Sequence, residues 1–589
     1  MRRHLTLNFE VVAYAGALLV AALLRLAKPE WPLLTDDQAA QALAAAAASR
    51  VPLALPLADT IAAATNPIYH AWTTLLFQAT GLTEGSARLI GELAGSALVL
   101  VPWLVRRTFG RWPALFGAWL LAGAPILVGV SRMPASGMIG LLAIGLALAG
   151  AHAWPASRRA DIGLGICLGA AGASGPEAIS GIVGVALGTA IYLGLRTRVV
   201  DPLPKPAPRD WRVVVTTAVV TFVLGCTAFG LVTSGLPAGF GAVGTWLSGW
   251  TSVASVSGLT LLAAFAIYQP LWLVLGVAGM LSASARRSAV GGWLACWMLG
   301  SLAVAMVYPG RSMQSLIWPT AAVSVLAGLP LADLLIQLRD REAWPTRLGL
   351  ALAMLLLLLF GGLQLVGYSS GSVAATSPLL GPSQQLLLAM AALLMVGLMA
   401  VLIGLGWSWG ESRVVTGSVV VTLLALLSVA AIWRLNHSLW ASTGQELSTR
   451  LTATMGQRLM AGSVDRVAGA RRSSADPVTL QVMGSLPPSL AWSLRAAPVE
   501  WLPASATEAP GIVLLPESEY EVRSPELRAE YRGQSLAVRA GWGWQSLLPP
   551  DLLNWYFRAI APIEQDRWVL LVRTDLVEPD LLPGVSAQP

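Results

Sequence analysis

Hydrophobic residues are arranged along most of this chain in runs long enough to cross a lipid bilayer. A transmembrane helix needs about 20 consecutive, mostly apolar residues. We predict thirteen spans, whose approximate ranges are 8–27, 86–105, 112–131, 137–154, 161–175, 177–195, 212–234, 257–282, 288–308, 317–338, 348–367, 384–407 and 414–434. The pattern therefore predicts a polytopic α-helical membrane domain over residues 1–434.

A long loop, residues 28–85, separates the first two predicted spans and contains two shorter helical stretches, 35–49 and 67–81. The second of these is also compatible with a span, but it is short and contains His70. Counting it as a span would invert every later loop. We interpret both stretches as helices lying along the membrane surface, so that the loop is structured.

The start of the first surface helix carries two adjacent carboxylates. Thr35 is a residue type that caps helices, and Asp36 and Asp37 follow in the first turn. The helix dipole favours negative charge there. A solvated, dipole-stabilised turn is one interpretation of this pair; chemistry at the membrane interface is the other.

The pattern changes after the last span, because charge density rises and the apolar runs shorten. Runs typical of strands occupy 478–484, 511–516, 535–541 and 568–573, and helical patterns occupy 437–460, 487–494 and 550–561. Strands alternating with helices indicate an α/β domain with a largely parallel sheet. We therefore predict a small C-terminal α/β domain over residues 435–589.

Composition agrees with a membrane protein, since only 12% of the residues are charged and the mean hydropathy is +0.66. An ordinary soluble domain has about 25% charged residues. The net charge of +7 comes from loops between spans and does not indicate nucleic-acid binding. The three cysteines lie in apolar spans, and Asp36 with Asp37 alone cannot fill a divalent shell. We expect no obligatory metal or other cofactor.

The distribution of cations predicts the orientation. Loops on one side of the predicted membrane hold 18 lysine and arginine residues, against 6 on the other. The richer side is cytoplasmic by the positive-inside rule. The N-terminus is then cytoplasmic in a multi-pass cell-membrane protein, whereas Asp36, Asp37 and the C-terminal domain lie outside.

Three short motifs follow the first span: TDDQAAQAL at 35–43, NPIYHAW at 66–72 and SRMPASGM at 131–138. Together with the span layout they resemble the GT-C superfamily of integral-membrane glycosyltransferases. The likeness is to the family 39 type, which includes protein O-mannosyltransferases and the aminoarabinose transferase that modifies lipid A. A weaker likeness is to the Agl23-like membrane proteins. The resemblance covers about residues 5–340.

This resemblance implies transfer of a sugar from a polyprenyl-phosphate donor to a hydroxyl of a glycan, lipid or protein acceptor at the outer face. Asp36 falls on the family's catalytic aspartate, and Asp37 on the following glutamate. Asn66 stands where the family has a basic residue. Arg132 is kept, but Gly137 stands where many members carry a second carboxylate.

The implied reaction needs a base and a partner for the leaving phosphate. A carboxylate near the acceptor hydroxyl can take its proton, a role for Asp36. A guanidinium can hold a phosphate through two parallel hydrogen bonds, and the outer candidates are Arg132, Arg311 and Arg88. Arg132 and Arg311 are otherwise interpreted as residues that anchor a span at the interface.

Three further polar residues complete the candidates for substrate or lipid-phosphate binding: Asn66, His70 and Glu92. His70 is equally compatible with an interfacial polar residue. Glu92 lies inside a span, where a carboxylate is costly unless paired, and Arg88 precedes it by one helical turn.

A second hypothesis is a non-catalytic member of the same fold, a scaffold or a lipid-linked-sugar handling protein in a membrane complex. Gly137 and Asn66, which depart from the family pattern, favour it. An ordinary transporter is less favoured because hydropathy reveals no inverted repeat.

Overall fold

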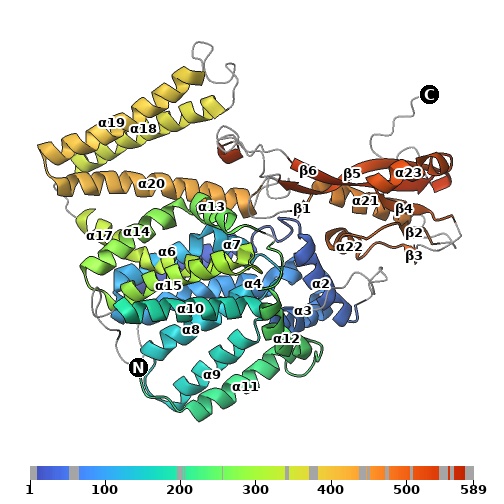
Figure 1. Ribbon diagram of the computed structural model, residues 1–589, viewed down its shortest axis with the longest axis horizontal. Helices are drawn as coiled ribbons and strands as arrows, with labels where there is room; N and C mark the ends of the chain where they lie inside the picture. Colours follow the sequence, from blue (N-terminus) through green and yellow to red (C-terminus); the bar gives the residue numbers. More distant parts are fainter. Residues whose placement is uncertain are drawn as a thin grey trace, which may run out of the picture.

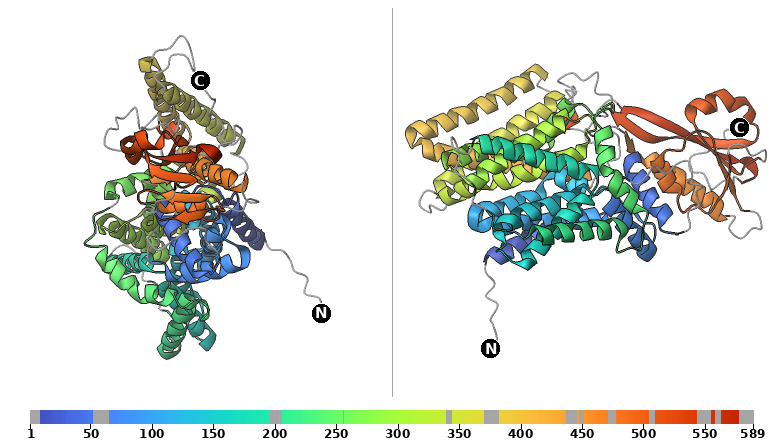
Figure 2. Two further views of the ribbon diagram at one scale, coloured as in Figure 1. Left: turned by 90° about the vertical axis from the view of Figure 1, so that its right-hand side faces the viewer. Right: turned by 60° about the horizontal axis from the view of Figure 1, so that its bottom comes forward.

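The computed structural model describes residues 9–51, 65–195, 203, 206–254, 256–338, 344–369, 382–436, 446, 451–470, 477–503, 509–542, 555–557 and 563–576. A bundle of helices occupies the described chain up to Asn436. A smaller domain that contains a β-sheet packs against one end of this bundle, as Figures 1 and 2 show. We call this end the domain-facing end.

Most helices of the bundle coincide with the predicted spans and surface helices, but α12 was not predicted. In chain order they are α1 (Phe9–Leu26), α2 (Asp36–Ala48), α3 (Pro67–Thr80), α4 (Glu84–Ala97), η2 (Leu98–Leu100), α5 (Val101–Phe109), α6 (Arg111–Gly123), α7 (Pro125–Ser131), α8 (Gly137–Ala153), α9 (Arg158–Gly172), α10 (Pro176–Leu195), α11 (Trp211–Thr227), α12 (Gly235–Ser248), α13 (Gly258–Tyr268), α14 (Pro270–Ala285), α15 (Ala289–Val307), η3 (Met313–Leu316), α16 (Ile317–Leu326), α17 (Gly328–Leu338), α18 (Trp344–Ser369), α19 (Pro382–Gly406) and α20 (Trp409–Asn436).

The membrane-spanning character follows from length and composition. Within the described chain, 8 helical stretches are long and apolar enough to cross a membrane, or up to 10 if each of two bent pairs is one span. The bent pairs are α6 with α7, at 55°, and α13 with α14, at 92°. Pro125 and Pro270 begin the second members, and proline removes a backbone donor at such breaks. The multi-pass prediction is confirmed, while thirteen stays a predicted count.

The two surface helices lie at the domain-facing end together with α12 (Figure 1). Helix α3 has 14 residues and is therefore about 21 Å long. The hydrocarbon core of a bilayer is about 30 Å thick. Its length thus fits the interpretation that segment 67–81 does not cross the membrane. Helix α2 begins where its sequence predicted, directly after Thr35.

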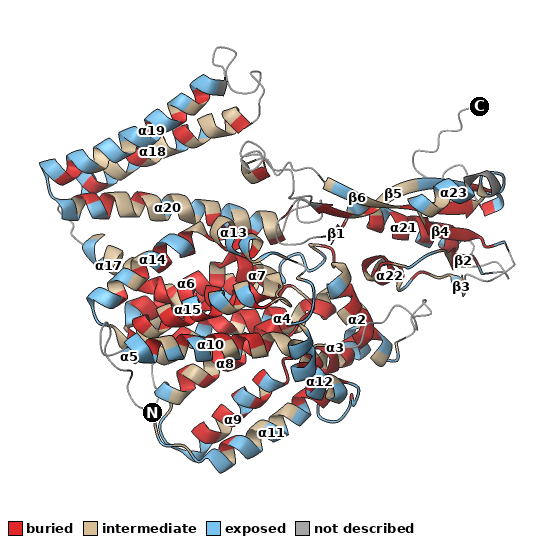
Figure 3. Ribbon diagram, in the orientation of Figure 1, coloured by how far each residue is buried: buried red, intermediate tan, exposed pale blue. Residues whose placement is uncertain are grey.

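The centre of the bundle is closely packed, and buried residues gather there along α6 and α15 (Figure 3). Nearly all residues of α16 are buried as well. Glycines let α10 and α15 approach closely. A Cβ at Gly188 would lie 2.5 Å from the backbone Cα of Trp297, and one at Gly184 would lie 2.9 Å from that of Ser301. Small residues at such contacts are typical of membrane helix pairs, because they let backbones touch.

Helices α18 and α19 pack mainly on each other and project from the rest of the bundle (Figure 1). Only 11% of the apolar window of α18 and 17% of that of α19 is buried within the protein. Most of their apolar surface therefore faces the lipid.

The C-terminal domain is built on a six-stranded sheet in the order β1-β5-β6-β4-β2-β3. Its elements are β1 (Leu451–Ala453), α21 (Met455–Ala470), β2 (Thr479–Val482), α22 (Pro488–Leu494), β3 (Glu500–Leu502), β4 (Ile512–Pro516), α23 (Glu517–Leu527), β5 (Tyr531–Trp542), β6 (Ile563–Arg573) and η6 (Thr574–Leu576).

Two predictions for this domain are corrected. The sheet is mixed, because only the pairs β2–β3 and β2–β4 are parallel, whereas β1–β5, β5–β6 and β4–β6 are antiparallel. The helix predicted at 437–460 begins only at Met455, and residues 451–453 form β1 instead. Most of its first half, like most of the helix predicted at 550–561, lies outside the described residues.

Packing of α10 on α15 predicts that alanine substitutions at Gly188 and Gly194, both in α10, change the stability of the protein very differently. Gly188→Ala should lower the free energy of unfolding by about 1–3 kcal/mol, since its Cβ meets backbone atoms that cannot move aside. Gly194→Ala should be neutral or stabilising, because nothing lies within 4 Å of its Cβ and alanine favours helix. Heating with a thiol-reactive dye measures this, as the cysteines Cys167, Cys226 and Cys296 are buried. Equal melting temperatures for the two variants would contradict it.

Candidate functional site

A hollow lies at the domain-facing end, where the bundle meets the C-terminal domain. Its cavity volume is about 70 Å³, and it is partly open to solvent. Its walls come from α2, α7, α13, η3, the end of α20 and β1. Apolar residues form most of the wall. The polar residues that line it are Thr35, Gln38, Arg132, Tyr268, Asn436, Glu446 and Thr452.

Asp36 lies beside this hollow in the first turn of α2, and its carboxylate contacts the C-terminal domain. Oδ1 accepts the backbone N–H of Ser489 at 3.1 Å and the Ser489 hydroxyl at 2.6 Å. Oδ2 accepts Nη1 of Arg539 at 2.6 Å. Asp37, the next residue, is exposed. The two predicted catalytic carboxylates therefore have different surroundings.

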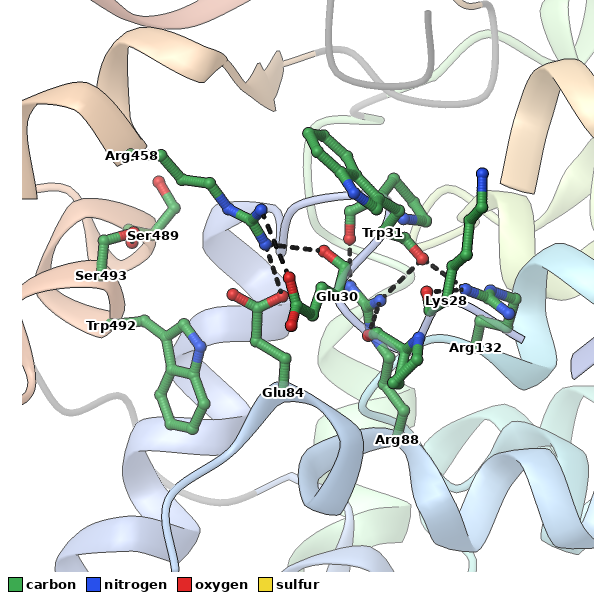
Figure 4. A network of polar contacts seen from close by, with 12 residues as sticks. Lys28, Glu30, Trp31, Glu84, Arg88, Arg132, Arg458, Ser489, Trp492 and Ser493 are labelled. Atoms are coloured by element: carbon green, nitrogen blue, oxygen red, sulfur yellow. Dashed lines mark hydrogen bonds and ion pairs between the residues drawn. The ribbon is translucent and has the colours of Figure 1, made fainter. Parts of the chain in front are cut away.

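The interface between the bundle and the C-terminal domain has further polar contacts at its rim. Arg458 of α21 lies between two carboxylates of the bundle, 3.6 Å from Glu30 and 3.5 Å from Glu84, as Figure 4 shows. Nε of Arg495 donates to the carbonyl of Leu82 at 2.9 Å. An apolar cluster in the middle joins α2 to α22 and includes Trp492, which stays 2% exposed.

Arg88 and Arg132, two of the predicted phosphate-binding cations, are buried and bonded to backbone carbonyls. The Nη atoms of Arg132 donate to carbonyls of residues 24–31, and those of Arg88 donate to carbonyls of residues 29–32. Both guanidinium groups meet at the carbonyl of Trp31 (Figure 4). Among the described atoms, only the Nε of each lacks a hydrogen-bond partner.

Glu92 lies among these arginines. It is 1% exposed, and its charge interacts with those of Arg132, Arg88 and Arg25. Arg25 in turn donates to the carbonyls of Ala122 and Leu121, at 3.0 and 3.2 Å. These three cations act on the charge of Glu92 from a distance, but among the described residues none of them forms an ion pair with its carboxylate, and its Oε1 has no hydrogen-bond partner. The pairing of Glu92 with Arg88 therefore stays a prediction.

Arg311 also bonds to the backbone. Its Nε donates to the carbonyl of Val256 at 2.7 Å, and Nη1 donates to that of Met306 at 2.8 Å. It does not line the hollow, although Met313, two residues later, does. The structure therefore places Arg132 at the hollow and Arg88 behind its wall, at the carbonyl of Pro32, whereas neither Arg311 nor the residues it bonds line the hollow.

Asn66, which precedes α3, and His70, in the first turns of α3, form hydrogen bonds with polar residues of neighbouring segments. Asn66 accepts the Ser136 hydroxyl at 2.8 Å and donates to Gln41 at 3.3 Å. Nε2 of His70 contacts the Ser234 hydroxyl at 2.9 Å. Burial lowers the pKa of His70, which favours the neutral form of its ring.

Gly137, at the position of the missing second carboxylate, begins α8 in a crowded environment. A Cβ there would lie 3.3 Å from Gln314 Oε1 and from Ile317. A longer acidic side chain would have to displace one of these neighbours.

A carboxylate that sequence reasoning did not single out lines the hollow instead. Glu446 is 2% exposed, accepts the Tyr268 hydroxyl at 2.7 Å and pairs with Arg434 at 2.8 Å. Burial raises the pKa of Glu446 although the charge of Arg434 acts in the opposite direction. Among the described residues, groups of three or more potential metal-ligating side chains are absent.

Ser489 and Arg539 were also missed, and no local signal marks them. Ser489 is one of many serines, and Arg539 stands within an ordinary strand pattern. They reach Asp36 only because the C-terminal domain folds back onto α2.

No family model and no curated protein matches the chain. Among solved structures it is similar to ArnT from Cupriavidus metallidurans bound to undecaprenyl phosphate, with a TM-score of 0.53 and 16% identity over 97% of this chain and 99% of that chain. The apo state of ArnT from the same organism gives 0.51, with 16% identity over 97% and 98%. The chain thus has the fold of ArnT along nearly its whole length, and the predicted GT-C-like fold is confirmed.

The contacts of Arg132 predict a structural requirement. Arg132→Met should lower the free energy of unfolding by about 3 kcal/mol or more, because several buried carbonyls lose their donor and each costs about 1–3 kcal/mol. Arg413→Met is the matched control, since Arg413 is exposed. Thermal unfolding in detergent measures both. A folded Arg132→Met protein that melts with the control would show that the carbonyl contacts contribute little.

Proposed function

We propose that this protein is a membrane glycosyltransferase, which moves a sugar from a polyprenyl-phosphate donor to an acceptor hydroxyl. The observation that carries the proposal is the likeness to ArnT, a protein seen bound to undecaprenyl phosphate, over the bundle and the C-terminal domain alike. The position of Asp36 at the start of α2 adds to it, because Asp36 directly follows Thr35, which lines the hollow.

In the proposed reaction the acceptor oxygen forms a bond to the anomeric carbon of the sugar as the bond from that carbon to the phosphate oxygen breaks. The hydroxyl proton passes to Asp36, which acts as general base. The polyprenyl phosphate leaves with the bonding electron pair. Asp36 suits this role because its side chain is 24% exposed and thus open to a hydroxyl.

The phosphate partner in this proposal is Arg132. It is the cation that lines the hollow among its described wall residues, and its Nε has no hydrogen-bond partner there. Since its Nη atoms are bonded to the backbone, Arg132 would contribute mainly its charge. Arg88 would act from behind the wall, through its contact with Pro32.

The proposed location of the site is the outer face of the cell membrane. The support is the excess of lysine and arginine in the opposite loops, which the positive-inside rule assigns to the cytoplasm. The C-terminal domain is then exterior and the N-terminus cytoplasmic.

A second candidate is a non-catalytic protein of the same fold that binds a lipid-linked sugar or supports a membrane complex. The commitment of arginines to backbone carbonyls favours it, as does the contact of Asp36 with the C-terminal domain. Asn66, at the family's basic position, is likewise bonded within the protein.

Substitution of the proposed base distinguishes the candidates. Asp36→Asn should lower the rate of transfer by about 10²–10⁴-fold, the usual contribution of a general base. The control Glu500→Gln, which also neutralises one carboxylate, should stay within a few-fold, since Glu500 is exposed and does not line the hollow. The measurement is release of undecaprenyl phosphate from a panel of undecaprenyl-phosphate-linked sugars by the purified full chain. Release by Asp36→Asn at the unsubstituted rate would contradict the mechanism, and absence of release from every donor would favour the second candidate.

A further inference from the structure

We propose that Arg539 and Ser489, both from the C-terminal domain, are positioning residues for Asp36, so that the site is complete only when this domain is docked. This inference rests on the proposed function, in which Asp36 is the base. The bonds that carry it link residues 453 and 503 positions apart in the chain.

The first argument is the geometry at the carboxylate. An ionised carboxylate has about four acceptor positions. Two donors of Ser489 and one of Arg539 occupy three of them, on both oxygens. The carboxylate is thereby fixed in rotation, and one position is left for an acceptor hydroxyl.

The second argument is that Asp566 fixes the position of the Arg539 guanidinium. Its Nε donates to Oδ2 of Asp566 at 2.8 Å, and Nη2 contacts the same oxygen, while Nη1 points to Asp36. Although partial burial lowers the pKa of Arg539, its hydrogen bonds with Asp36 and Asp566 raise it overall. A planar guanidinium bonded on both sides has little freedom, so it can orient the carboxylate it meets.

The third argument is a local irregularity in the strand that carries Arg539. The register of β5 against β6 shifts between Ala537 and Arg539, which leaves Val538 as an extra residue. Such β-bulges re-aim a side chain and are over-represented next to active sites. Beyond the bulge Arg539 lies opposite Asp566, the residue that holds it.

The contact at Asp36 is separable from the general docking of the domain. Arg458 pairs with Glu30 and Glu84, and Trp492 packs in the apolar cluster, without touching Asp36. The interface therefore offers a control, since Arg458→Ala removes an ion-pair partner at the same interface and leaves the carboxylate untouched.

The experiment compares Arg539→Ala, Arg539→Lys, Ser489→Ala and Arg458→Ala in the full chain. Release of undecaprenyl phosphate gives kcat and KM, and hydrogen exchange of α2 and α22 reports docking. We expect Arg539→Ala to lower kcat by about 10- to 100-fold with KM little changed, because a small misplacement of a catalytic group is costly. Arg539→Lys should fall in between, since an ammonium keeps the charge but lacks the planar fork that bonds Asp36 and Asp566 in a fixed geometry.

We expect Ser489→Ala to lower kcat less, because the backbone N–H remains, and Arg458→Ala to leave it within a few-fold. Equal losses in Arg458→Ala and Arg539→Ala, with exchange raised in both, would place the effect in docking and overturn the inference. If hydrogen exchange shows that Arg539→Ala undocks the C-terminal domain, the test passes to Arg539→Lys. A docked Arg539→Lys protein with full kcat overturns the inference, and a docked Arg539→Lys protein with lowered kcat supports it. Full activity of Asp36→Asn would refute the proposed base itself, whereas inactive Asp36→Asn beside fully active Arg539→Ala refutes only the positioning.

Discussion

The hydrogen bonds from Arg88 and Arg132 to the chain that leaves α1 are the constraint on which the rest of the structure depends. Backbone between α1 and α2 is not helical, so its carbonyls need donors from elsewhere. Near a membrane few waters can supply them, and an unpaired carbonyl is costly. Two buried guanidinium groups meet this need at residues 24–32. They thereby set the start of α2, the position of Asp36 and one wall of the hollow.

The interface between the bundle and the C-terminal domain does not depend on buried arginines bonded to backbone carbonyls. Its middle is apolar, around Trp492, and its rim consists of partly exposed ion pairs at Arg458 and Arg539. Exposed pairs of this kind contribute about 0–1 kcal/mol each. The apolar middle therefore supplies most of the affinity between the two parts, and the pairs mainly determine their register. A carboxylate that serves chemistry can be held in such a rim without being sealed from solvent.

Sequence predicted the bundle well because each span is encoded locally, by a run of apolar residues that periodicity and length reveal. The C-terminal sheet was predicted less well. Four of its six strands were predicted, and the short strands β1 and β3 were missed. The strand directions depend on which strand lies beside which, as in the antiparallel pairing of β4 with β6. The candidate site divides in the same way. Asp36 and Arg132 were marked by local motifs, whereas Ser489, Arg539 and Glu446 reach the site through tertiary contacts that no short pattern encodes.

The separation in sequence between Asp36 and its partners also has a consequence in time. A chain is synthesised from its N-terminus, and its domains generally fold as units in that order. The bundle and α2 are therefore made well before Ser489 and Arg539 exist. Throughout that interval the carboxylate is present but unoriented, so a truncated or still-growing chain carries an incomplete site. The site would become complete only at the end of folding, when the sheet that carries Arg539 forms.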